Sequence, residues 1–143
     1  KERFPEIKLH LAGSYMSSKL TNLKQENVII HGRVDSVPKF MSEHGTLVVP
    51  LQSGSGIRVK ILEAMSVATP VIATSIGFEG IPVLNRIEGI VANTTQEICD
   101  AIWDLKETPA LAQIIGQKGQ KMIQQKYSQQ QVSDKLYEFL QSF

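Results

Sequence analysis

The stretch that decides the fold runs from Leu47 to Pro82 and reads LVVPLQSGSGIRVKILEAMSVATPVIATSIGFEGIP. It starts with an apolar, β-branched run ending at Pro50, which is typical of a short buried strand. A loop of small residues follows, and apolar residues at helical spacing then predict a helix over residues 57–67. The run at residues 70–74 predicts the next strand, because Pro70 stands first, where no ladder hydrogen bond is lost. This order indicates a parallel β-α-β unit.

The same alternation continues on both sides of this unit. Toward the N-terminus, strands are predicted at residues 7–12 and 28–30 and a helix at residues 36–44. Toward the C-terminus, a weaker strand at residues 89–92 is followed by helices alone, which open at Thr94, at Pro109 and at Ser128. We therefore expect one domain of the α/β class, an open parallel sheet of about five strands with flanking helices and a helical C-terminal tail.

Length and composition exclude several classes of function. A chain of 143 residues fits one domain, and its net charge of +1 gives no field strong enough to indicate binding to nucleic acid or to a membrane surface. The single cysteine, Cys99, rules out an internal disulfide framework. No apolar run approaches the ~20 residues of a transmembrane helix. Because the chain starts at Lys1 rather than at Met, we expect a piece of a longer protein.

The loop that opens the helix at residues 57–67 is the candidate ligand site. Gly54 and Gly56 would let the backbone approach a ligand, and the N–H groups of a helix start suit phosphate. Gly56, Lys60 and Glu63 fall on one helical face. The third glycine of a dinucleotide fingerprint and the Lys-Ser/Thr of a P-loop are both missing. Spacing alone therefore leaves open both a phosphate-binding loop and a plain tight turn, in which Glu63 simply pairs with Lys60.

Residues 50–65, PLQSGSGIRVKILEAM, resemble the donor-site signature of family 4 glycosyltransferases, which have the GT-B fold. Residues 69–74 and 77–81 resemble the next strand and loop of that family, and residues 9–13 and 28–34 resemble its two preceding strands. The resemblance covers nearly the whole chain. It implies that residues 1–143 form a single Rossmann-like domain, the C-terminal domain that binds the nucleotide-sugar donor.

The resemblance also implies roles for individual residues. Glu63 would accept hydrogen bonds from the ribose hydroxyls, because a carboxylate is an acceptor suited to a vicinal diol. The backbone after Gly32 would line the base pocket, and the loop from Gly54 would meet the diphosphate and the sugar. The implied donor-binding residues are Gly32, Arg33, Val34, Gly54, Ser55, Gly56, Ile57, Arg58, Lys60 and Glu63. The catalytic residues stay unknown. Backbone dipoles and cations would stabilise the leaving diphosphate, so we expect no metal ion and no cofactor besides the substrate.

Two departures from the family pattern matter. Family members often carry two glutamates eight positions apart, and Ser55 stands where the first would be. The acceptor domain and the first strand of the donor domain are not in this sequence, so we expect no sugar transfer by these residues alone. In the family that strand lies between the strands expected at residues 7–12 and 46–50. We expect these two strands to close the gap, or another chain to fill it, which would allow self-association.

The resemblance predicts a bacterial enzyme, cytoplasmic or peripheral to the inner face of the membrane. It would transfer a hexosyl unit with retention to a glycan or a lipid-linked acceptor. Two alternatives remain open: a non-catalytic flavodoxin-like binding module, and a fragment of a GT-B nucleotide-sugar epimerase. The base, the sugar, the acceptor, the stereochemical outcome and the oligomeric state are not determined by the sequence.

The histidines are interpreted as structural residues. His10 alternates with apolar residues and is expected to be a partly covered sheet residue. His31 lies next to the expected base pocket, and packing is favoured for it over ligand binding. His44 precedes Gly45 and is expected at the C-terminus of a helix, where a cation suits the dipole.

Overall fold

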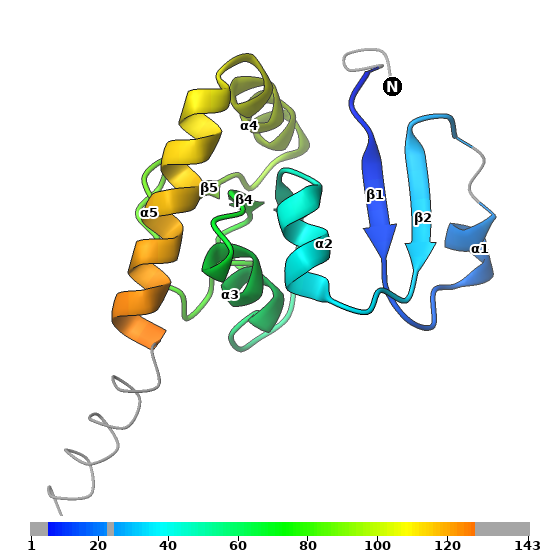
Figure 1. The fold of residues 1–143 in the computed structure, drawn as a ribbon, viewed down its shortest axis with the longest axis horizontal. Coiled ribbons are helices and arrows are strands. Elements are labelled where there is room, and N and C mark those ends of the chain that lie inside the picture. The colour runs from blue at the N-terminus through cyan, green and yellow to red at the C-terminus, as the bar shows by residue number, and fades with distance from the viewer. Residues whose placement is uncertain (1–5, 23–24, 128–143) are drawn as a thin grey trace, which may run out of the picture.

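The structure is a computed structural model that describes residues 6–22 and 25–127 (Figure 1). Its elements, in chain order, are β1 (Leu9–Ala12), α1 (Ser18–Thr21), β2 (Val28–Gly32), α2 (Val37–Glu43), β3 (Leu47–Val49), α3 (Val59–Ser66), β4 (Val71–Ala73), β5 (Ile90–Val91), α4 (Thr95–Glu107) and α5 (Pro109–Tyr127). Every strand expected from the sequence is present, and the short α1 was not expected. The helix expected to open at Ser128 lies outside the described residues.

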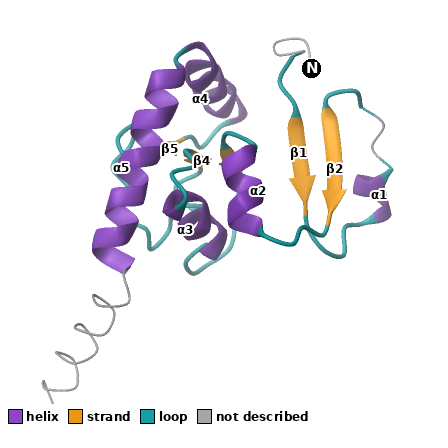
Figure 2. Ribbon diagram, in the orientation of Figure 1, coloured by secondary structure: helices purple, strands orange, loops and turns teal. Residues whose placement is uncertain are grey.

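All the described strands run parallel, and helices flank them (Figure 2). They form a sheet of β1 and β2 and a sheet in the order β3-β4-β5. The predicted α/β class, with about five parallel strands followed by helices, is therefore confirmed. Because the strands are parallel within each sheet, the loops that leave their carboxyl ends gather at one edge of that sheet.

The division into two sheets corrects one expectation. The sequence predicts that the strands at residues 7–12 and 46–50 close the gap between them. In the described part of the chain, β1 pairs only with β2, and β3 pairs only with β4. The prediction that these two strands pair directly is therefore wrong. Instead, the end of α2 reaches β1, where the ring of His44 lies 4.1 Å from that of His10. Filling of the gap by another chain stays a prediction.

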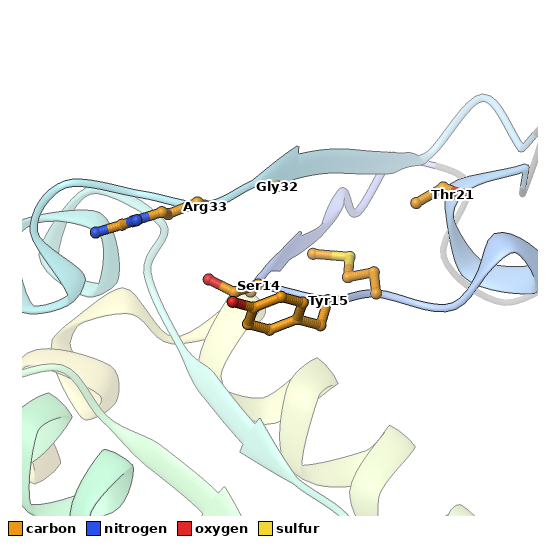
Figure 3. Close-up of a pocket in the computed structure, with 7 residues that line it drawn as sticks. Ser14, Tyr15, Thr21, Gly32 and Arg33 are labelled. Atoms are coloured by element: carbon orange, nitrogen blue, oxygen red, sulfur yellow. The ribbon is translucent and has the colours of Figure 1, made fainter.

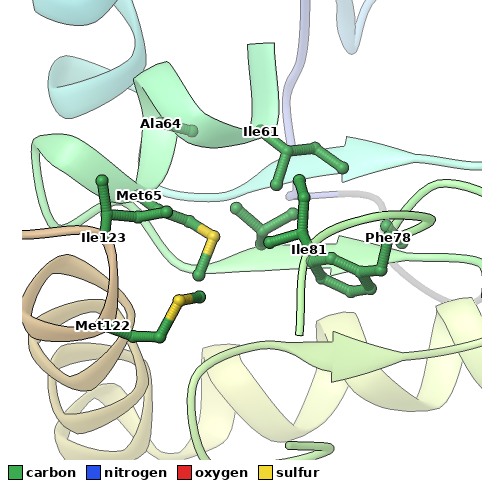
Figure 4. Close-up of a cluster of buried hydrophobic side chains, with 9 residues drawn as sticks. Ile61, Ala64, Met65, Phe78, Ile81, Met122 and Ile123 are labelled. Carbon is green, nitrogen blue, oxygen red and sulfur yellow. The ribbon is translucent and has the colours of Figure 1, made fainter. Parts of the chain in front are cut away.

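Strand β4 is the centre of the hydrophobic core. Its residues Val71, Ile72 and Ala73 are each at most 1% exposed. Val71 and Ala73 belong to a cluster with α3 and α5, whereas Ile72 belongs to a second cluster with α4 and α5. Figure 4 shows the first cluster, in which Met122 and Ile123 of α5 face side chains of α3. A strand covered on both faces explains why its sequence is a continuous apolar run.

Strands β1 and β2 lie in a more open environment. None of their residues is fully buried, and Leu9 is 49% exposed. Among the described residues, neither hydrophobic cluster includes a side chain from β1 or β2. The smaller sheet is therefore held to the rest of the domain by contacts at its margins, such as the ion pair between Glu6 and Lys106 of α4.

Helices α2, α4 and α5 begin where the sequence predicts, whereas α3 begins at Val59, two residues later than predicted. Ser36 caps α2 by accepting a hydrogen bond from the N–H of Lys39. Thr94 and Glu97 form a complete capping box at the start of α4. Within residues 6–22 and 25–127, no helix has both the length and the apolar character that crossing a bilayer requires.

Helix α5 packs closely on the loop after α3 at a glycine. A Cβ atom added at Gly116 would lie only 2.0 Å from the carbonyl oxygen of Ala68. We expect Gly116→Ala to lower the free energy of unfolding by about 1–3 kcal/mol, the usual cost of overpacking. Gln117→Ala, at an exposed position of the same helix, should change it by less than about 0.5 kcal/mol. Urea denaturation measures both. In an uncrowded helix, alanine stabilises by about 1 kcal/mol relative to glycine, so a stabilised Gly116→Ala would contradict this packing.

The capping box makes stability depend on pH. The backbone N–H groups of Asn93 and Thr94 donate to Glu97, at 2.6 and 3.0 Å, and hold the pKa of its carboxyl below the usual 4.5. A lowered folded-state pKa adds stability above pH 4.5, and this stability is lost as the pH falls through that pKa. We expect Glu97→Gln to be less stable than wild type at pH 7, with a difference that shrinks below pH 4.5. Thermal unfolding across this range tests it, and a difference independent of pH would contradict it.

Candidate functional site

A pocket lies at the carboxyl ends of β1 and β2. Its volume is about 440 Å³, and it is lined by Gly13, Ser14, Tyr15, Met16, Thr21, Gly32 and Arg33. Figure 3 shows Gly32 and Arg33 on one side of it, Ser14 and Tyr15 on the other, and Thr21 at its far end. Two of the residues predicted for the base pocket, Gly32 and Arg33, therefore line a real depression, where ligands of open parallel sheets bind.

The loop after β1 is a part of this pocket that sequence reasoning missed. The sequence marks Gly13 and Ser14 only as the end of a strand. Tyr15 is fully exposed and has a φ of 59°, a left-handed conformation that few residues other than glycine adopt. An exposed aromatic ring in a strained backbone at a strand end is a feature of functional loops. The sequence did contain one signal for this loop: it follows a predicted parallel strand, and ligands bind where such strands end.

The glycine loop between β3 and α3 has the backbone that its sequence predicts. Gly54 and Gly56 have φ values of 128° and 83°, which side chains other than hydrogen strongly disfavour. The loop is exposed from Ser53 to Ile57, so its backbone is open to a ligand. In Figure 1 this loop lies at the end of the molecule toward which the arrowheads of β1 and β2 point.

Arg58 shapes the glycine loop instead of extending into solvent. Its Nη1 donates to the carbonyl oxygens of Ser55 and Gly56, at 2.5 and 2.6 Å. A Cβ atom at Gly54 would lie 2.7 Å from Nη2 of Arg58, so a side chain there would displace the guanidinium. Its Nε is buried and has no hydrogen-bond partner among the described residues. A guanidinium that leaves a buried donor unpaired has capacity for a further acceptor at this loop.

Lys60 and Glu63 lie on the first turns of α3 and pair with one another. Lys60 Nζ lies 2.9 Å from Glu63 Oε2, and their side chains are 60% and 32% exposed. The neighbouring residues Ile61, Ala64 and Met65 face the core, so Glu63 lies at the margin of the buried face and not within it. The pairing anticipated as the simple alternative is present. It occupies one carboxylate oxygen, and a carboxylate has about four lone-pair positions.

The ten predicted donor-binding residues fall into two groups. Gly32, Arg33 and Val34 lie where β2 ends, and the other seven lie between Gly54 and Glu63, where α3 begins. Gly32 and Arg33 line a pocket, and Val34 is not among its lining residues. The second group offers exposed backbone, a guanidinium, an ammonium and a carboxylate. The N–H groups at the start of α3 and the cations of the second group are chemically suited to an anion.

Parallel strands, alternating helices and a glycine loop at the carboxyl edge define a Rossmann-like ligand-binding domain. The family model described as Glycosyl transferases group 1 matches residues 1–108. The chain therefore belongs to this family of glycosyltransferases, and its fold is that of a GT-B C-terminal domain. No curated protein matches the sequence.

Solved glycosyltransferase structures share the fold. HepE from Anabaena, in complex with UDP-glucose, superposes with a TM-score of 0.80 at 18% identity, covering 97% of this chain and 42% of HepE. TarM from S. aureus, a mutant in a complex that includes UDP, gives a TM-score of 0.80 at 22% identity, covering 96% of this chain and 29% of TarM. The C-terminal domain of LpcC from Francisella tularensis gives a TM-score of 0.66 at 23% identity, covering 73% of this chain and 56% of the LpcC chain. The chain thus spans less than half the length of HepE.

The pair of Lys60 and Glu63 should contribute little to folding. Exposed helical pairs of this kind contribute about 0.3–0.5 kcal/mol, and salt weakens them. We expect Glu63→Gln to lower the free energy of unfolding by no more than about 0.5 kcal/mol, measured by urea denaturation. A much larger loss would show that Glu63 supports the fold, which would contradict its place at the margin of the core.

Proposed function

We propose that this chain is the donor-binding domain of a glycosyltransferase and binds a nucleoside diphosphate sugar along the carboxyl edge of its strands. The observation that carries this proposal is the exposed, left-handed glycine loop between β3 and the start of α3, followed by Lys60 and Glu63. Membership of the glycosyltransferase family supports it. The complexes of HepE and TarM with UDP make UDP the first nucleotide to test.

The diphosphate is assigned to the glycine loop. The first N–H groups of α3 have no partner within the helix, and the helix dipole favours negative charge there. Arg58 now donates to two backbone carbonyls of the same loop. Phosphate oxygens are stronger acceptors than neutral carbonyls because the hydrogen bond is then charge-assisted. Arg58 can therefore exchange those carbonyls for phosphate, and its unpaired Nε gains a partner.

The nucleoside is assigned to Glu63 and to the ends of β1 and β2. Glu63 accepts from the ribose hydroxyls while Lys60, already bound to the carboxylate, remains close to the phosphates. The base occupies the pocket beside Gly32 and Arg33, where Tyr15 offers an aromatic ring. No metal ion is required, because backbone dipoles and cations supply the positive field.

The proposal for the whole protein goes further than donor binding. This chain covers 42% of the length of HepE. For the chain by itself we therefore propose donor binding without sugar transfer. In the full enzyme, an acceptor domain would complete the site. The enzyme would then transfer a hexosyl unit, with retention, to a glycan or a lipid-linked acceptor at the cytoplasmic side.

Calorimetric titration of UDP, GDP and ADP into the chain tests donor binding. We expect UDP to bind. In urea denaturation, UDP at 100 times its Kd should raise the free energy of unfolding by about 2.7 kcal/mol. Glu63→Gln should weaken UDP binding about 10- to 100-fold, because a hydrogen bond to a charged group contributes about 1.5–3 kcal/mol. The matched control is Glu43→Gln, which removes a carboxylate from a similar exposed Lys–Glu pair on α2, with Lys39 at 3.9 Å.

A second ligand separates the ribose contact from a general loss of binding. The 2′-deoxy analogue of UDP should bind less tightly than UDP to wild type and to Glu43→Gln. Glu63→Gln should bind both nucleotides equally, because the carboxylate and the hydroxyl act as one pair. If UDP, GDP and ADP all fail to bind, the proposal is contradicted and a non-catalytic binding module is favoured. If Glu63→Gln weakens binding of UDP and of 2′-deoxy-UDP by the same factor, only the contact between Glu63 and the ribose is contradicted.

A further inference from the structure

The chain contains only three histidines, and the fold brings all of them together. His10 comes from β1, His31 from β2, and His44 is the residue that ends α2. They are far apart in the sequence, and none of them lines the pocket beside Gly32. Figure 1 shows α2 between the β1–β2 pair and helices α3, α4 and α5 in that view, so the cluster joins the smaller sheet to the rest of the domain.

The geometry of the cluster fits a single metal ion. One ring nitrogen from each histidine lies within 4.8 Å of the other two, and His10 Nδ1 lies 2.9 Å from His31 Nε2. Tetrahedral zinc with Zn–N bonds of about 2.0–2.1 Å separates its nitrogen ligands by about 3.3 Å. Small side-chain rotations therefore bring the three nitrogens to ligating distances. The 2.9 Å contact between His10 and His31 is a hydrogen bond, which a bound ion would replace.

The surroundings orient His44 as a ligand. Its Nδ1 lies 2.6 Å from the carbonyl oxygen of Phe40, and since a carbonyl only accepts, Nδ1 carries the proton. The lone pair then sits on Nε2, the arrangement found in metal-binding histidines whose other nitrogen donates to a backbone carbonyl. The ring of Phe40 stacks on His44 at 4.1 Å and meets His31 edge-on at 4.9 Å, which gives the site an apolar wall.

The cluster is open to solvent on one side. His31 is exposed, so an ion can enter from solvent.

We propose that His10, His31 and His44 bind one Zn²⁺ ion, which fastens the β1–β2 sheet to α2. Imidazole ligands select zinc and similar transition metals over magnesium or calcium. Three protein ligands leave a fourth position for water, whereas most structural zinc sites have four protein ligands. The role proposed here is to link two elements, because the smaller sheet contributes no side chain to either hydrophobic cluster in the described part of the chain. The ion is separate from the diphosphate site, for which no metal is proposed.

Titration of the untagged, chelator-treated chain tests this site in the absence of nucleotide. We expect Co²⁺ to give visible absorption bands that saturate at one equivalent, Zn²⁺ to displace it, and Zn²⁺ to raise the Tm. His31→Gln and His44→Gln should each weaken Zn²⁺ binding at least about 10-fold and abolish the rise in Tm. Cys99→Ser is the matched control, because it removes the single thiol, on α4, and should bind like wild type.

Three outcomes would overturn the proposal: no saturation at one equivalent, unchanged affinity in His31→Gln, or loss of binding in Cys99→Ser. Since the side chain of His31 is exposed, His31→Gln should fold even if His44→Gln does not. Hydrogen exchange of the β1 and β2 amides should slow with Zn²⁺ in wild type but not in His31→Gln. Because no nucleotide is present, neither result depends on the proposed donor site.

Discussion

The fold depends on the burial of β4 on both of its faces. Val71 and Ala73 pack toward α3 and α5, and Ile72 packs toward α4 and α5, so one three-residue strand joins both hydrophobic clusters. Burial of these side chains also fixes the position of β3, which pairs with β4 and leads into the glycine loop. The positions of Gly54 and of the start of α3 therefore depend on core packing several residues away from the loop itself.

Rigid and open parts of the domain have different tasks. The three-stranded sheet and α3 to α5 hold the charged groups of the loop on a packed base, at the proposed diphosphate site. The β1–β2 sheet carries the pocket but lies outside both clusters among the described residues. Its contacts with the remainder are polar or aromatic, as in the pair of Glu6 with Lys106 and the rings around His44. Such contacts respond to ions and ligands more readily than a packed core does.

The proposed donor site and the proposed zinc site meet on β2. His31 precedes Gly32 and Arg33, so the residue assigned to the metal is the immediate neighbour of residues that line the pocket. An ion that fastens β2 to α2 would also restrict the backbone of the pocket. Restricting a binding surface before the ligand arrives lowers the cost of ordering it, so the zinc site and the donor site would reinforce one another.

The sequence by itself determined the five strands and the longer helices of the described chain and marked the glycine loop as its candidate site. Apolar runs, Ser36, the Thr94–Glu97 box and the glycines are local signals, because strand burial, helix caps and left-handed turns each depend on a few neighbouring residues. Only the tertiary structure decided that β1 does not pair with β3, that Arg58 folds onto its own loop, and that the three histidines converge. These features join residues that are distant in the chain or depend on side-chain rotamers, and periodicity in a sequence carries no information about either.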